Sequence, residues 1–100
     1  MGLDVIWRNE QGDELGAFYD QDDVFVRAVA DLREREYPTL GRIDEYRTTQ
    51  LPPSDSLVEE ISRIRSGSSD AAARERLSAL VGLLRRAAVS PGTYLEFIGD

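Results

Sequence analysis

The sequence contains no cysteine, no histidine and no lysine, so all 12 of its basic residues are arginines, set against 19 acidic residues. Without imidazole, thiol or amine, the chain lacks the common general base near neutral pH, the thiolate nucleophile and the Schiff-base amine. The nitrogen and sulfur ligands of ordinary zinc, copper and iron sites are missing too. We therefore assign no catalytic residue, no metal ligand and no cofactor, and we favour a binding role over an enzymatic one.

Long apolar runs are also lacking, and no stretch approaches the length that spans a membrane. Residues 1–5 include Asp4 and show no basic region followed by an apolar one, so no signal segment is indicated. The absence of cysteine excludes the disulfide framework that small secreted domains often need. These features predict a cytoplasmic protein.

The net charge is −7 at pH 7. Such a field repels phosphate backbones and anionic lipids, so we expect neither a nucleic acid nor a membrane as partner. A basic protein or a metal cation is what it would attract. The alternative is that acidity only keeps a small protein soluble.

The 100 residues, 41% of them hydrophobic, are enough for one core and one domain spanning 1–100. Period-2 and helical patterns alternate irregularly along the chain, which predicts an α+β domain with a mostly antiparallel sheet and helices on one face. The predicted strands cover residues 3–8, 15–19, 42–51 and 93–98, and the predicted helices cover 23–36, 56–66 and 69–89.

The densest carboxylate cluster is Asp20, Asp22 and Asp23. Oxygen-rich loops can bind calcium or magnesium, but this one lacks the remaining ligands of an EF-hand. We favour helix capping, with Asp23 at the start of the first helix. For the second helix, Ser56 and Glu59 have the spacing of a capping box.

The candidate partner-binding residues are Asp44, Glu45 and Tyr46, within the predicted third strand, together with Trp7. On a strand, Asp44 and Tyr46 would share one face and Glu45 the other. A solvated strand face is the simpler alternative for these three residues. Trp7 could serve as an interface anchor or as a core residue.

The segments Gly2–Val5, Arg42–Tyr46 and Tyr94–Asp100 resemble parts of small uncharacterised actinobacterial proteins of about 100 residues. That resemblance implies no catalytic residue. In size and acidity the chain is also similar to immunity proteins that neutralise bacterial toxins, which implies acidic surface residues opposing a basic toxin site.

These observations lead to a non-enzymatic protein-binding domain as the leading hypothesis, specifically an immunity-type inhibitor of a basic partner. Two alternatives stay open: a module that binds a small molecule or a metal cation, and an enzyme that works through carboxylates. The sequence leaves the oligomeric state and the strand order open.

Overall fold

The computed structural model describes residues 2–30 and 32–99 and contains a four-stranded sheet. All neighbouring strands are antiparallel, and their order across the sheet is β2-β1-β4-β3. The strands are β1 (Asp4–Asn9), β2 (Glu14–Phe18), β3 (Thr48–Leu51) and β4 (Thr93–Ile98).

The first two strands form a hairpin, as predicted. Gly12 has a φ of 88°, a left-handed value that costs glycine little, which lets the chain reverse. The Asn9 side-chain oxygen accepts hydrogen bonds from the backbone N–H groups of Gln11 and Asp13 and so holds the turn. Leu3 and Val5 are fully buried on one side of the sheet, as the period-2 pattern predicts, but Ile6 on the other side is only 5% exposed, so burial does not alternate cleanly along β1.

The closing strand β4 lies between β1 and β3, so the prediction of an interior strand is confirmed. The prediction of a strand over residues 42–51 was wrong in its first half, because β3 begins only at Thr48. Asp44 forms a local turn instead: its side chain accepts the N–H of Tyr46 and its carbonyl accepts that of Arg47. Aspartate often competes with sheet pairing in this way.

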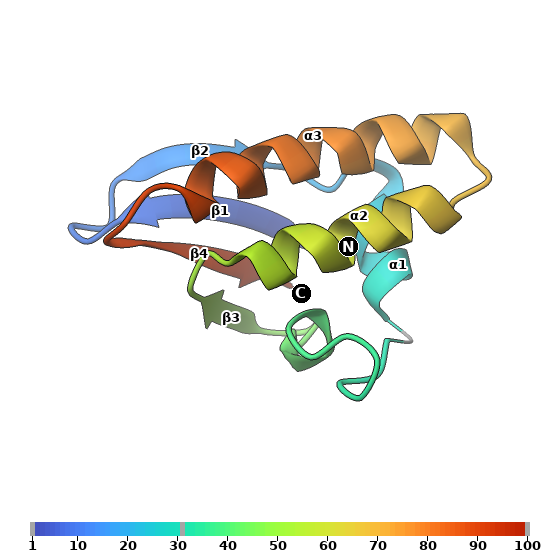
Figure 1. The fold of residues 1–100 in the computed structure, drawn as a ribbon, viewed down its shortest axis with the longest axis horizontal. Helices are drawn as coiled ribbons and strands as arrows, with labels where there is room; N and C mark the ends of the chain where they lie inside the picture. Colours follow the sequence, from blue (N-terminus) through green and yellow to red (C-terminus); the bar gives the residue numbers. More distant parts are fainter. Residues whose placement is uncertain (1, 31, 100) are drawn as a thin grey trace.

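Two long helices, α2 (Asp55–Gly67) and α3 (Ala71–Ala88), pack against each other and cover one side of the sheet (Figure 1). Asp70 caps α3 through a hydrogen bond from Ala72 N–H, close to the predicted start. The capping box at Ser56 and Glu59 was wrong, because Ser54 is the residue that caps α2, accepting Leu57 N–H. Ser54 itself has an extended backbone, with φ −156° and ψ 156°, and the helix begins directly after it.

The first helix is much shorter than the predicted span of 23–36: α1 covers only Val24–Val29. It follows a 3-10 turn, η1 (Gln21–Asp23), and a second such turn, η2 (Leu40–Arg42), comes before β3. The segment 32–36 offers Leu32 as its single apolar side chain and is otherwise charged. A further helical turn there would bury little, which explains the early end.

The predicted α+β class, the element order and the placement of the helices on one face are confirmed. The core lies between the sheet and α2 with α3, and α1 closes one end of it. No helix in the described ranges is long and apolar enough to cross a membrane. The largest fully buried side chains of the core include Phe25, Leu40, Leu57, Ile61, Leu77, Leu80, Leu84, Leu95 and Phe97.

Candidate functional site

The side of the sheet turned away from α2 and α3 carries no helix of the described chain, and we call it the open sheet face (Figure 1). At its centre the Arg8 guanidinium donates to the Glu96 carboxylate, which also accepts a 3.4 Å hydrogen bond from Gln50. The hydrogen bond to Glu96 raises the pKa of Arg8 above its ordinary value. The face therefore presents a fixed polar row across three strands.

The 44–47 turn, which holds three of the four predicted binding residues, lies at one end of the sheet, just beyond β4. It packs against Gly99, just after β4, and Gly99 N–H donates to the Arg47 carbonyl. A Cβ at Gly99 would come within 2.2 Å of the Glu45 carbonyl oxygen, so the contact is tight. Asp44 N–H donates in turn to the Thr49 hydroxyl of β3.

This turn combines a fixed backbone with an exposed aromatic side chain. Tyr46 is 64% exposed, although Asp44 accepts its backbone N–H at 2.9 Å. Asp44 is exposed and Glu45 is half-buried. Both acidic side chains and the phenol ring are thus presented on a turn whose backbone is already ordered.

Trp7 lies elsewhere, on the helix-covered side of β1 opposite Leu95 and Gly16. It packs against the core, and its ring nitrogen is buried without a hydrogen-bond partner. The structure therefore brings Asp44, Glu45 and Tyr46 together and leaves Trp7 apart from them.

The predicted carboxylate cluster divides into different tasks. Asp20, 8% exposed, accepts hydrogen bonds from the backbone N–H groups of Leu3, Phe25 and Val26, and so joins the start of β1 to α1. Capping by the cluster is confirmed, but Asp20 performs it: Asp23 precedes α1 and its side chain makes no capping hydrogen bond. Asp22 forms an ion pair with Arg76 of α3 at 2.6 Å.

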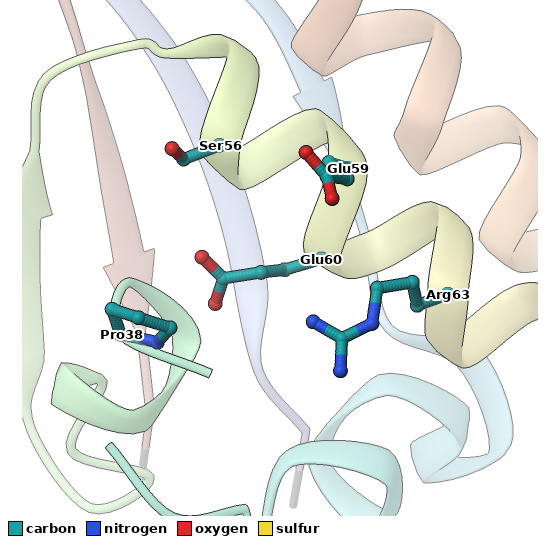
Figure 2. Close-up of a pocket in the computed structure, with 5 residues that line it drawn as sticks. All are labelled: Pro38, Ser56, Glu59, Glu60 and Arg63. Atoms are coloured by element: carbon teal, nitrogen blue, oxygen red, sulfur yellow. The ribbon is translucent and has the colours of Figure 1, made fainter. Parts of the chain in front are cut away.

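A small pocket of about 160 Å³ lies between α2 and the segment before η2, and we call it the α2 pocket. Figure 2 shows the Glu60 carboxylate pointing from α2 toward this segment, with Arg63 one turn further along the helix. Glu60 is only 4% exposed, and its carboxylate accepts the backbone N–H groups of Thr39 and Leu40. The other lining residues are Pro38, Ser56 and Glu59.

Two charged side chains of the α2 pocket, Glu60 and Arg63, already contact other parts of the chain. The Glu60 carboxylate accepts backbone N–H groups at the start of η2, and the Arg63 guanidinium lies 4.5 Å from the Tyr37 ring centre. Pockets that take drug-sized ligands usually measure about 300–1,000 Å³. The sequence did carry a signal for Glu60, because it lies on the buried stripe of α2 beside Leu57 and Ile61, where an unpaired charge would be costly.

Within the described residues, no group of three or more acidic side chains is arranged to hold a metal ion. Comparison with known proteins found no matching family model, curated protein or solved structure. The 44–47 turn, the open sheet face and the α2 pocket are therefore the features from which we infer a function.

Proposed function

We propose that this chain is a non-enzymatic protein-binding domain that docks a basic partner through the 44–47 turn and the adjoining end of the sheet. The observation that carries the proposal is the 64% exposure of Tyr46 on a turn whose backbone is fixed by hydrogen bonds. Tyrosine is enriched among the residues that dominate binding energy at interfaces. A fixed backbone reduces the entropy lost when the partner binds.

Charge supports a basic partner. Asp44 and Glu45 directly precede the tyrosine, the exposed Arg47 follows it with its Nε 3.9 Å from the Asp44 carboxylate, and the whole chain carries a net charge of −7. Such a surface attracts arginine and lysine side chains, speeds encounter and fixes the orientation of the complex. An immunity-type inhibitor that covers the basic site of a toxin is the specific form of this function that we favour.

The α2 pocket would serve the alternative function, binding of a small polar ligand. It offers two carboxylates, a guanidinium and a hydroxyl. Its volume of about 160 Å³ and the engagement of Glu60 with backbone N–H groups make it the weaker candidate.

The test is affinity capture from the source organism's lysate, followed by binding kinetics with the purified partner. We expect Asp44→Asn with Glu45→Gln to slow association and to flatten its dependence on salt, because long-range attraction is lost. Tyr46→Ala should weaken binding about 30-fold, the size expected for a residue that dominates an interface.

The matched control is Glu10→Gln with Glu75→Gln, which changes the net charge equally at exposed positions on the hairpin and on α3. It should leave the salt dependence nearly unchanged. A partner that binds the 44–46 variants as tightly and as fast as the wild type would overturn the proposal.

A further inference from the structure

The outer edge of β2 is free of any pairing strand in the described part of the chain, because β2 is the first strand in the order β2-β1-β4-β3. Free edges invite pairing with another strand, and proteins usually block them with proline, charge or a very short strand. The opposite edge strand, β3, is blocked in this way: it has four residues and runs into Pro52 and Pro53. β2 has no proline, and its one charge, Glu14, lies at its start.

Two of the few large apolar side chains that the structure leaves exposed lie along this edge. Leu15 is 45% exposed and Tyr19, directly after β2, is 60% exposed. The shift in register between Trp7 and Arg8 affects only the start of β2, so pairing stays regular over Gly16–Phe18. The exposed positions are thus arranged around a regular strand segment.

We propose that β2 pairs with β2 of a second copy of this chain, forming a symmetric dimer with one continuous eight-stranded sheet. In an antiparallel pair centred on Ala17, Ala17 lies opposite Ala17 of the other copy, and the numbers of any two opposite residues add up to 34. Leu15 of each copy then faces Tyr19 of the other. The symmetric dimer therefore contains two Leu15–Tyr19 pairs, which cover both exposed residues in both copies. Gly16 lies opposite Phe18 and leaves it room, which favours a second copy over an unrelated strand.

Helix α3 supports the same arrangement. Arg76 of α3 bonds the Gln21 carbonyl beyond the end of β2, and Leu83 lies over Gly16, so one flank of the helix runs beside the β2 edge. Helical spacing places Ala79 and Gly82 on or next to this flank, and a Cβ at Gly82 would meet nothing within 4 Å. Joining two β2 edges brings the two α3 flanks side by side: Ala79 and Gly82 leave room for that approach, while Arg86, one turn after Gly82, reaches over Gly16 of its own copy.

The proposed interface is independent of the proposed partner site. β2 and β3 are the opposite edges of the sheet, so a dimer through β2 leaves both 44–47 turns free. One strand pair and one helix flank make an interface at or below the low end of about 1,200–2,000 Å² that stable complexes bury. We therefore expect an association that depends on concentration.

The experiment is sedimentation of the full chain from about 1 μM to about 1 mM, a range that brackets weak association. The wild type should shift from 11.2 kDa toward twice that mass. Leu15→Glu and Gly82→Arg should each raise the dissociation constant at least about tenfold, because each places two charges or two bulky groups at the symmetric contact. Tyr46→Glu is the matched control and should dimerise as the wild type does.

Amide hydrogen exchange gives a second readout that does not depend on any variant. Those amides of residues 16–18 that point away from β1 should become more protected as the concentration of the wild type rises, since they gain hydrogen-bond partners across the new strand pair. A mass of 11.2 kDa throughout the range would overturn the proposal. A dimer that persists unchanged in both Leu15→Glu and Gly82→Arg would overturn it equally, because its interface would lie elsewhere.

Discussion

At the scale of single residues, this protein uses two buried carboxylates to bind backbone rather than to perform chemistry. Asp20 and Glu60 each accept backbone N–H groups from segments distant in the sequence, and each holds a short element in place. A buried charge is tolerated when hydrogen bonds satisfy it. In a chain without histidine or cysteine, these buried acids would otherwise be the first candidates for catalysis.

Replacing Asp20 by alanine should lower the free energy of unfolding by about 3 kcal/mol, since the N–H groups of Leu3, Phe25 and Val26 lose a charged acceptor. Asp70→Ala is the matched control, because Asp70 caps α3 through one exposed hydrogen bond. Its loss should cost about 1 kcal/mol. Urea unfolding of both variants measures the difference, and equal costs would contradict the role of Asp20.

Glu60→Ala should destabilise the protein by about 2 kcal/mol, because two backbone N–H groups at the start of η2 lose their acceptor. Hydrogen exchange at Thr39 and Leu40 should accelerate. Glu59→Ala is the control: Glu59 lines the same pocket from the next position of α2, and its loss should be nearly neutral. If both variants were equally stable, Glu60 would be available for binding a ligand.

At the scale of elements, sequence periodicity correctly predicted the helices and strands that have large apolar faces. The long stripe of α3 and the apolar residues of β4 fix those elements almost to the residue. The predictions failed at α1 and β3, where short apolar patterns end in charged segments and local hydrogen bonds decide the backbone. Asp44 illustrates this: its side chain accepts Tyr46 N–H and makes a turn where alternation predicted a strand.

The candidate site followed the same rule. Asp44, Glu45 and Tyr46 are adjacent in sequence, so their proximity was predictable, but the turn that presents them was not. Its position depends on the contact with Gly99, more than 50 residues away. The Glu60 contact with η2 joins segments about 20 residues apart, and no local pattern identifies its backbone partners.

Gly99→Ala tests whether that contact positions the turn. Because the added Cβ would lie 2.2 Å from the Glu45 carbonyl oxygen, the turn must move and the hydrogen bond to Arg47 should weaken. We expect a loss of about 1–3 kcal/mol, typical of overpacking. Gly67→Ala is the control, since a Cβ there meets nothing within 4 Å. Unchanged stability and unchanged amide exchange at residues 97–99 in Gly99→Ala would contradict the tight contact.

At the scale of the whole molecule, the fold depends on its last strand. β4 pairs with β1 over six residues and is the strand that joins β3 to the sheet. Leu95 and Phe97 are fully buried beneath the helices. Residues at the end of the chain therefore complete a core that the first residues begin.

Removing residues 93–100 should unfold the protein. Burial of a large apolar side chain contributes about 1.5–3 kcal/mol, so losing Leu95 and Phe97 alone removes much of the roughly 5–15 kcal/mol that stabilises a small domain. β3 would also lose its partner strand, and the helices would expose the side that faced β4. Circular dichroism of the truncated chain should show no cooperative melting. A synthetic peptide of residues 93–100, added in excess, should restore part of the cooperative transition, because the peptide can pair with β1 and β3 in place of β4. The full chain with Thr93→Ala, which loses only the hydrogen bond from the Thr93 hydroxyl to the Ser90 carbonyl, should still melt cooperatively. A truncated chain that melts cooperatively at the wild-type temperature would show that the core closes without β4.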